Sequence, residues 1–188
     1  MTAALTIRPL TPARWHDLVA LFGPNGACGG CWCMFHRQTG PEYEAGKGVR
    51  NRRALRRRVV AGEVPGLIGY LDGEPVAWVA VEPREHYARL MRSRKLLPAG
   101  VPVWSVPCFF VRRGFRKRGL SAQMLHAAAA HAGTHGAEVV EGYPMDTTGP
   151  TPAAFAYPGV AATFVKCGFT EVARRSATRP VMRLTVGG

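Results

Sequence analysis

The chain has 188 residues, of which 47% are hydrophobic and 20% charged, and its formal net charge is +13. This length and composition predict a single folded domain over residues 1–188, and they exclude an intrinsically disordered chain. No apolar run approaches the ~18 residues that a membrane span needs, so we expect no membrane partner.

The spacing of apolar residues predicts strands and helices along the whole chain. Helices show one apolar face, with proline near the start or glycine at the end, and strands lie between turn residues. In chain order the predicted elements are strand Leu5–Pro9, helix Pro12–Phe22, helix Val49–Ala61, strands Gly66–Leu71 and Pro75–Val81, a helical or irregular stretch Glu85–Leu97, strand Val103–Val111, helix Ser121–Gly136, strand Glu138–Tyr143, helix Val160–Lys166, and strands Phe169–Arg174 and Val181–Val186. This order indicates a mixed α/β domain.

Three local signals refine these elements. Thr11 is a good N-cap for the first helix, because its hydroxyl can accept a bond from a free backbone N–H. The turn Asp72-Gly73-Glu74 is typical of a hairpin between the second and third strands. Pro107 lies inside a predicted strand, and it predicts a bulge or an unpaired stretch there.

The positive charge admits two interpretations. Arginines gather in the stretches Arg50–Arg58 and Arg84–Lys95, and a cationic surface attracts anions such as nucleic acids or small polyphosphates. A basic nucleic-acid-binding module is therefore one alternative for the chain. The first stretch is one short helix with little aromatic interleaving for base stacking, which argues against nucleic acid as the partner.

The cysteines cluster near the N-terminus. The chain has five of them, an odd number, and its N-terminal segment lacks the basic start and apolar core of a signal peptide. We therefore expect reduced thiols and a cytoplasmic protein. Cys28, Cys31 and Cys33, with His36 nearby, could hold zinc. The close spacing of Cys31 and Cys33 is unusual for a zinc knuckle, and we expect no metal.

The most informative stretch is a strand, a basic turn and a helix. Phe109–Val111 ends the strand, and the turn Arg116–Ser121 leads into the helix. The first turn of a helix has unpaired N–H groups and the positive end of the dipole, so it can bind a pyrophosphate. Gly119 allows close approach because it has no side chain. The stretch predicts an anion site.

This stretch resembles the acetyl-coenzyme A (acetyl-CoA) loop of the GNAT superfamily of N-acetyltransferases. The family pattern Arg/Gln-x-x-Gly-x-Gly/Ala reads here Arg116-x-x-Gly119-x-Ser121, and Phe164–Phe169 resembles the later helix that ends in Gly-Phe. The resemblance implies a GNAT-like, mostly antiparallel central sheet with flanking helices. It also implies that two splayed parallel strands, Val103–Val111 and Glu138–Tyr143, form the cofactor cleft.

The resemblance implies how acetyl-CoA binds as a co-substrate. Main-chain groups of the cofactor strand would hold the pantetheine arm, and N–H groups of the loop would hold the pyrophosphate. The strand residues are Phe109, Phe110 and Val111, and the loop residues are Arg116, Lys117, Arg118, Gly119, Leu120 and Ser121.

The resemblance leaves the catalytic residues open. The family's usual tyrosine position is here Phe164, which has no proton to give, and Tyr157 stands where many members carry asparagine. Tyr157 and Tyr143 are the candidate acids, and Glu141 is the candidate base, with packing or a salt bridge as the alternatives. Cys108 on the cofactor strand is a buried packing residue or, alternatively, a site of covalent acetylation.

The predicted function is acetyl transfer from acetyl-CoA to a primary amine of a small molecule or a protein, by direct attack in a ternary complex. The family's acceptor side implies a substrate pocket lined or covered by Cys28, Trp32, Met34 and Phe35. If the basic stretches face the cleft, a neutral or acidic amine is favoured. A non-catalytic acyl-CoA-binding protein is the remaining alternative, and a homodimer is left open.

Overall fold

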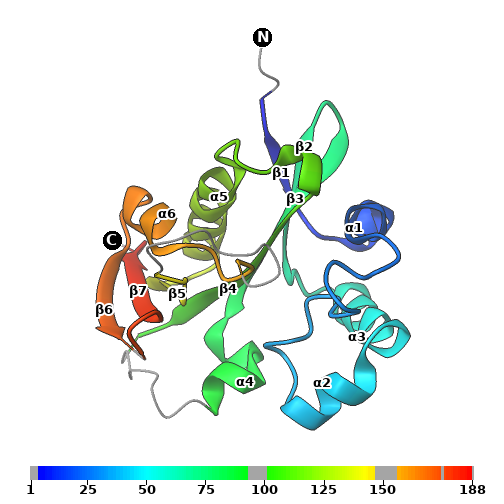
Figure 1. The fold of residues 1–188 in the computed structure, drawn as a ribbon, viewed down its shortest axis with the longest axis horizontal. Helices are drawn as coiled ribbons and strands as arrows, with labels where there is room; N and C mark the ends of the chain where they lie inside the picture. The colour runs from blue at the N-terminus through cyan, green and yellow to red at the C-terminus, as the bar shows by residue number, and fades with distance from the viewer. Residues whose placement is uncertain (1–3, 93–100, 147–155, 175, 188) are drawn as a thin grey trace.

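The computed structural model describes residues 4–92, 101–146, 156–174 and 176–187 (Figure 1). A single mixed sheet runs through it, in the spatial order β1-β2-β3-β4-β5-β7-β6. Its strands are β1 Thr6–Pro9, β2 Gly66–Leu71, β3 Glu74–Pro83, β4 Val103–Val111, β5 Val139–Gly142, β6 Thr170–Arg174 and β7 Pro180–Thr185. Neighbouring strands are antiparallel except for β4 and β5, which are parallel.

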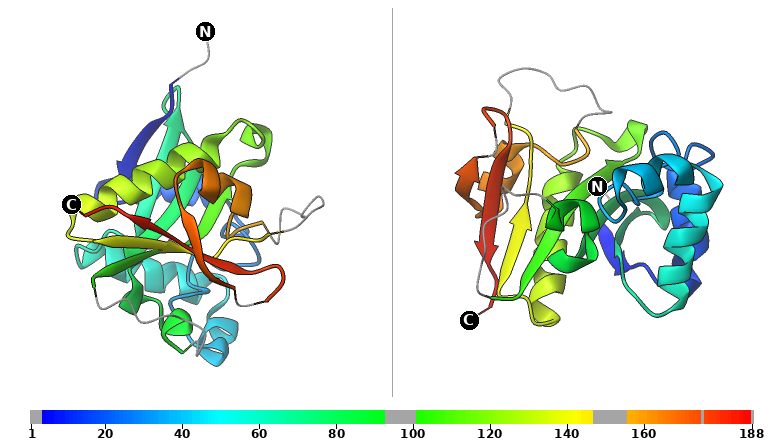
Figure 2. Two further views of the ribbon diagram at one scale, coloured as in Figure 1. Left: turned by 90° about the vertical axis from the view of Figure 1, so that its left-hand side faces the viewer. Right: turned by 90° about the horizontal axis from the view of Figure 1, so that it is seen from below.

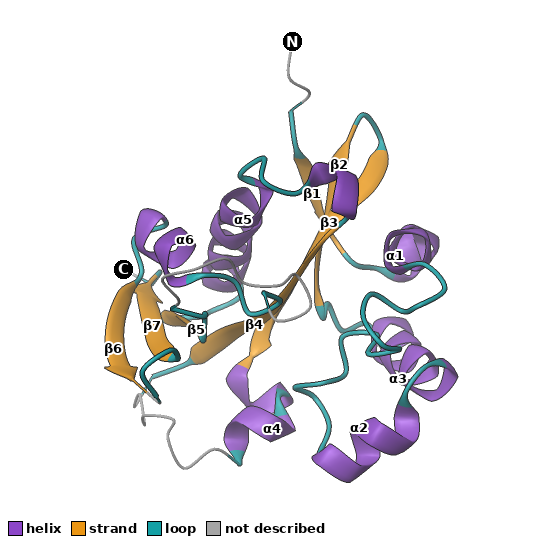
Figure 3. Cartoon of the chain, in the orientation of Figure 1, coloured by secondary structure: helices purple, strands orange, loops and turns teal. Residues whose placement is uncertain are grey.

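Helices cover both faces of this sheet (Figures 2 and 3). They are α1 Trp15–Phe22, α2 Gly40–Gly46, α3 Val49–Val60, α4 Ala88–Met91, α5 Leu120–Thr134 and α6 Ala161–Lys166, with short 3-10 helices at Pro12–Arg14, Arg84–His86 and Arg113–Phe115. Helices α5 and α6 pack on one face, whereas α1 and α3 pack on the other. In the described part of the chain, no helix combines the length and apolarity needed to cross a membrane.

Strand β3 shows why the sheet can be covered on both sides. All residues from Val76 to Val81 are fully buried. Val79 and Val81 belong to the apolar cluster under α5, while Trp78 and Ala80 belong to the cluster under α1 and α3. Successive side chains of a strand point to opposite faces, so an uninterrupted apolar run packs against helices on both faces of the sheet.

The predicted fold class is confirmed, and the predicted helices and strands occur in the expected order, with helix α2 in addition to them. The bulge predicted at Pro107 is seen as a register shift, because Ala80 pairs with Cys108 but Glu82 pairs with Ser105. Proline lacks the N–H that a regular ladder would use here.

Two local details differ from the sequence-based predictions, and a third predicted stretch lies partly outside the described residues. Thr11 occupies the cap position, but its side chain makes no capping hydrogen bond and the first turn is 3-10 rather than α-helical. Helix α2 was not predicted, although Thr39 and Glu42 form a capping box at its start. The predicted stretch Glu85–Leu97 contains a short helix at Ala88–Met91, and its residues from 93 onward lie outside the described part of the chain.

Candidate active site

The parallel strands β4 and β5 pair only at their beginnings. Their register runs from Val103 opposite Val139 to Val106 opposite Gly142, where β5 ends, while β4 continues to Val111. Beyond that point the segment around Tyr157 lies beside β4, and the carbonyl oxygen of Tyr157 accepts the Phe109 N–H at 2.6 Å. The second half of β4 is therefore flanked by the Tyr157 segment rather than by a strand, and this contact occupies the Phe109 N–H that was predicted to hold the pantetheine arm.

The loop that follows β4 presents unpaired backbone donors. Lys117 and Gly119 have φ angles of 61° and 74°, so the chain turns sharply before α5 begins at Leu120. Within the described residues, none of the N–H groups from Arg116 to Ser121 donates a hydrogen bond. Residues 116–119 are exposed, and a Cβ atom placed on Gly119 would meet nothing within 4 Å. Such a row of free N–H groups at a helix start can bind an anion.

Three arginines of this region contact neighbouring groups. Arg116 donates through Nε to the carbonyl oxygen of Val111 at 2.9 Å, which ties the loop to the end of β4. Arg112 forms an ion pair with Glu74. The side chain of Arg118 lies over the ring of Phe115, with 5.3 Å between Cζ and the ring centre. These contacts place positive charge beside the free N–H groups.

A cavity of about 560 Å³ joins this loop to the cysteine-rich segment near the N-terminus. Its lining includes the predicted residues Phe109, Phe110, Val111, Arg116, Ser121, Tyr157, Cys28 and Phe35. It also includes Cys31, Cys33 and His36, which were weighed as zinc ligands, and Cys108, which was weighed as a site of covalent acetylation. The other lining residues had not been considered for a site: Phe22, Ala27, Arg37, Tyr43, Trp78, Pro107 and Ala156. The cavity thus brings the cofactor strand and the cysteine segment together.

Trp32 and Met34 were expected to line the substrate pocket, but they are not among the described residues that line the cavity. They are 4% and 5% exposed and belong to the apolar cluster under α1 and α3. The ring of Trp32 stacks on that of Trp15, with 6.3 Å between the ring centres. Both residues therefore lie behind the cavity wall.

Glu141 and Tyr143 form a closed polar cluster away from the described cavity lining. Tyr143 donates to Glu141 Oε1 at 2.6 Å and lies 2.9 Å from Ser105 Oγ. Glu141 is fully buried and pairs with Arg183 at 2.7 Å and Arg84 at 3.4 Å. Burial and the neighbouring Glu141 carboxylate raise the pKa of Tyr143 well above its ordinary value.

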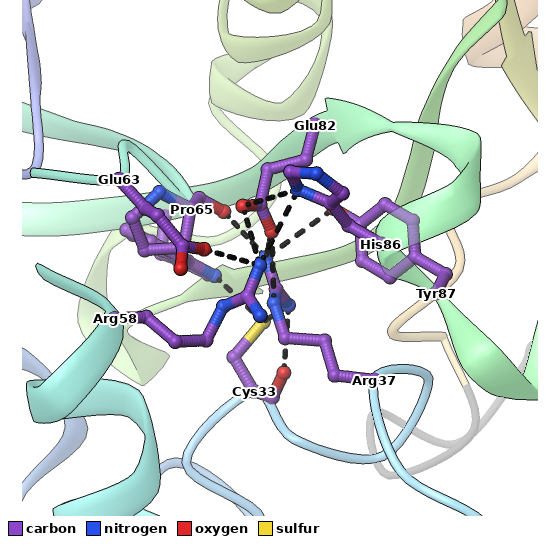
Figure 4. A network of polar contacts seen from close by, with 9 residues as sticks. Cys33, Arg37, Arg58, Glu63, Pro65, Glu82, His86 and Tyr87 are labelled. Atoms are coloured by element: carbon purple, nitrogen blue, oxygen red, sulfur yellow. Dashed lines mark hydrogen bonds and ion pairs between the residues drawn. The ribbon is translucent and has the colours of Figure 1, made fainter. Parts of the chain in front are cut away.

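The cysteine segment is fixed by a buried ion-pair network, shown in Figure 4. Glu82 Oε2 accepts from Arg37 at 2.6 and 2.9 Å, and Glu82 Oε1 accepts from Arg58 at 2.9 Å. Glu82, Glu63 and His86 also bring potential metal ligands together, but the Arg58 guanidinium lies among them. No grouping of the cysteines with ligand spacing occurs in the described residues. The cluster Glu63/Glu82/His86 is thus an ion-pair site for arginine.

Sequence reasoning singled out the cysteines but missed Arg37 and Tyr43. Both are single polar residues whose spacing follows no motif. Helix α3 stands out in the sequence because it is rich in arginine, but none of its arginines is among the described residues that line the cavity. The arginine charge of the lining comes from Arg37 and Arg116.

Comparison with known proteins places this geometry in a broader context. The family model of the acetyltransferase (GNAT) family matches residues 32–148, well over half of the chain. A search of curated proteins found no match.

Solved structures share the fold at low sequence identity. PaiA N-acetyltransferase from Thermoplasma acidophilum, in complex with coenzyme A, is 11% identical with a TM-score of 0.56, over 97% of this chain and 99% of that one. A GNAT-family acetyltransferase from Streptococcus agalactiae is 14% identical with a TM-score of 0.57, over 98% and 97%. An acetyltransferase from Thermus thermophilus is 21% identical with a TM-score of 0.52, over 98% and 99%.

Proposed function

This chain belongs to the GNAT family of acetyltransferases, and on that premise we propose that it transfers the acetyl group of acetyl-CoA to a primary amine by direct attack in a ternary complex. The amine belongs to a small molecule or to a protein. The observation that carries the proposal is the row of free N–H groups at Arg116–Ser121, which opens onto the same cavity as the second half of β4. Acetyl-CoA supplies the acetyl group as an activated thioester.

The donor would lie along the loop and β4. The N–H groups of residues 116–121 suit a pyrophosphate, because they have no hydrogen-bond partner among the described residues and lie at the positive end of the α5 dipole. Arg116, Lys117 and Arg118 surround them with positive charge. Arg116 and Ser121 line the cavity, as do Phe109, Phe110 and Val111 of β4. A pantetheine arm that starts at the loop can therefore follow β4 into the cavity.

The acceptor would enter from the cysteine segment. That part of the lining is rich in aromatic rings, including Phe35 and Tyr43, and its arginine charge comes from Arg37. No aspartate or glutamate is among the described lining residues. An apolar, aromatic wall without carboxylates suits a neutral or acidic amine with an apolar body better than a polycation.

Tyr157 is our first candidate for the acid that protonates the departing thiolate. Among the predicted catalytic residues Tyr157, Glu141 and Tyr143, it alone lines the cavity. Burial raises the pKa of Tyr157, so its hydroxyl keeps its proton at neutral pH and can donate it. Glu141 and Tyr143 rank below Tyr157 as candidates for proton transfer, because their cluster lies off the cavity.

The donor site can be tested by thermal unfolding with and without acetyl-CoA. A ligand at a hundredfold excess over Kd stabilises the native state by about 2.7 kcal/mol, which raises the Tm of a domain of this size by about 5–10 °C. Gly119→Glu places bulk and negative charge at the free N–H groups and should abolish this rise. Gly136→Glu is the matched control, because Gly136 also has a positive φ, of 87°, and open space around it at the other end of α5.

The two variants separate strain from binding. Both place a side chain at a positive φ, but a carboxylate is favourable at the start of α5 and unfavourable past its end, so the unliganded Tm should fall less in Gly119→Glu. The response of each variant to acetyl-CoA is therefore measured against its own unliganded Tm. A Gly119→Glu variant that still responds to acetyl-CoA as the Gly136→Glu variant does would disprove the assigned donor site. Release of coenzyme A thiol across a panel of apolar and aromatic amines then identifies the acceptor class.

A further inference from the structure

Helix α3 carries a dense and unbalanced positive charge. Its sequence, Val49–Val60, contains six arginines and no aspartate or glutamate. Leu55 and Val59 are fully buried in the cluster under α1 and α3, so the helix turns its apolar side to the core and its other sides to solvent. The exposed arginines are Arg50, Arg52, Arg53, Arg56 and Arg57.

These five arginines have no counter-charge in the described part of the chain. Arg58, the sixth arginine of α3, pairs with Glu63 and Glu82, whereas the exposed five form neither an ion pair nor a side-chain hydrogen bond with any described residue. Arg52 is oriented in another way, because its Cζ lies 5.3 Å from the centre of the Trp32 ring. The guanidinium groups of α3 can therefore bind an anion from outside the protein.

The charge distribution of α3 is unfavourable for the helix by itself. Cations oppose the helix dipole at its N-terminus, and the first turn contains Arg50 and Arg52 without an acidic residue. Side chains three or four positions apart are neighbours on a helix, so Arg53 repels both Arg56 and Arg57. An anion bound along α3 would relieve both effects, which favours its binding.

The exposed arginines of α3 lie apart from the proposed acetyl-CoA site. Helix α3 packs on the opposite face of the sheet from α5, the helix that follows the donor loop (Figure 1). No residue of α3 is among the described residues that line the cavity. The phosphates of acetyl-CoA at the donor loop therefore do not account for this charge, and a separate anionic partner is needed.

We propose that α3 is a docking surface for double-stranded nucleic acid, which its exposed arginines bind through the phosphates without reading the base sequence. This surface goes beyond the proposed acetyl transfer and does not depend on it. A duplex carries about one negative charge per 1.7 Å of its axis, and a helix of this length spans about 18 Å, so α3 can face several phosphates at once. Each guanidinium can bind a phosphate through two N–H groups.

Other anionic partners fit α3 less well. Single strands are bound by bases that stack on accessible aromatic rings, and the Trp32 ring beneath Arg52 is only 4% exposed. An amphipathic helix binds a membrane through its apolar face, but the apolar face of α3 is already buried in the protein. A tight protein partner places its main anchors in pockets, whereas a duplex needs only accessible positive charge.

The experiment measures binding of the full chain to a fluorescent duplex of random sequence, about 20 base pairs long, by anisotropy between about 50 and 200 mM salt. If each of the five exposed arginines contacts a phosphate, the plot of log K against log salt should have a slope of about −4.5, because each contact contributes about −0.9.

A matched pair of double variants locates the surface. Arg53→Gln with Arg57→Gln should make the slope shallower by about 2 and weaken binding about 10–100-fold at 0.1 M salt. This variant should keep its fold and its Tm, because both side chains are exposed and the substitutions reduce repulsion within α3. Arg8→Gln with Arg92→Gln removes the same charge from exposed positions outside α3 and should keep the slope of the parent.

Equal losses in the two double variants would overturn the proposal, because net charge rather than α3 would then bind the duplex. Tighter binding to phosphatidylserine vesicles or to polyglutamate than to the duplex at the same salt would also overturn it. Saturating acetyl-CoA should leave duplex binding intact, and its loss would move the duplex to the donor loop. Stabilisation by acetyl-CoA is measured without duplex, so failure of the docking surface and failure of the proposed function give different results.

Discussion

The hydroxyl of Tyr157 is the single group on which the proposed chemistry can be tested most directly. Its ring lies 5.9 Å from that of Phe35 and 6.0 Å from that of His36, measured between ring centres. Tyr157→Phe removes the hydroxyl and keeps this packing. Because a positioned acid contributes about 10²–10⁴-fold to rate, we expect kcat to fall within that range while acetyl-CoA still raises the Tm.

Tyr70→Phe is the control for this prediction. Tyr70 lies on β2, where its hydroxyl donates to Asp17 at 2.7 Å, and it is not among the described lining residues of the cavity. Its variant should lose some stability and keep kcat. Equal kcat values for Tyr157→Phe and the parent would remove Tyr157 from the mechanism.

Phe164 shows how one position can depart from the family resemblance without disturbing the fold. It is fully buried, and its ring contacts those of Phe169 and Phe109, with centres 5.0 and 6.1 Å away. A hydroxyl at this position would enter an apolar cluster, where an unpaired polar group is unfavourable. Phenylalanine here is a core residue, which is why the acid must be sought on the cavity wall.

At the scale of elements, strand β5 and helix α6 pack closely where Gly142 faces the ring of Phe164. A Cβ atom on Gly142 would lie 2.1 Å from Cε1 of Phe164. We expect Gly142→Ala to lower the free energy of unfolding by about 1–3 kcal/mol, as overpacking of a core does. Urea denaturation of the variant and the parent measures this difference.

Gly133→Ala is the matched control for Gly142→Ala. Gly133 lies within α5, and a Cβ atom there would meet its nearest neighbour, the carbonyl oxygen of Val186, at 3.4 Å. Alanine also favours helix more than glycine does. A Gly133→Ala variant should therefore be as stable as the parent or more so, and a Gly142→Ala variant that matches it would refute the close contact with Phe164.

At the scale of the whole molecule, Glu82 joins parts of the chain that are far apart in sequence. It lies on β3 and binds Arg37 of the cysteine segment, Arg58 of α3 and His86 of the following 3-10 helix. Glu82→Gln leaves the Arg37 charge buried without its carboxylate. Breaking a buried pair in this way costs about 3–5 kcal/mol, and we expect a loss of that size in urea denaturation at neutral pH.

The pH dependence of stability follows from the same group. Burial opposes the charge of Glu82, but Arg37 and Arg58 outweigh it, so the pKa of Glu82 is lowered. The unfolded chain therefore takes up this proton first, and stability should fall as the pH drops below about 4.3. Glu82→Gln should lose this share of the pH dependence.

An exposed ion pair provides the comparison. Glu44 pairs with Lys47 at 2.6 Å, and the Glu44 side chain is 64% exposed. Glu44→Gln should change the free energy of unfolding by about 0–1 kcal/mol. If Glu82→Gln proved equally mild, the buried network would not be what fixes the cysteine segment.

Local signals in the sequence were enough to predict most of the elements, and they also predict an anion site at the loop before α5. The apolar run of β3, the proline in β4 and the glycine before α5 each act through neighbouring backbone atoms or the strand period, so their effects survive in any fold that contains them. Helix α2 was missed although its capping box was present, because its turn of chain carries few apolar residues.

The cavity was decided only by the tertiary structure. Its walls come from segments far apart in sequence, and the side chains that donate to the Cys33 sulfur are Arg37 of the cysteine segment and Trp78 of β3. Whether Trp32 or Cys33 faces the cavity depends on a strained turn that long-range packing holds. The sequence determined which groups exist and which local shapes they take, whereas their meeting required the sheet to bring distant segments together.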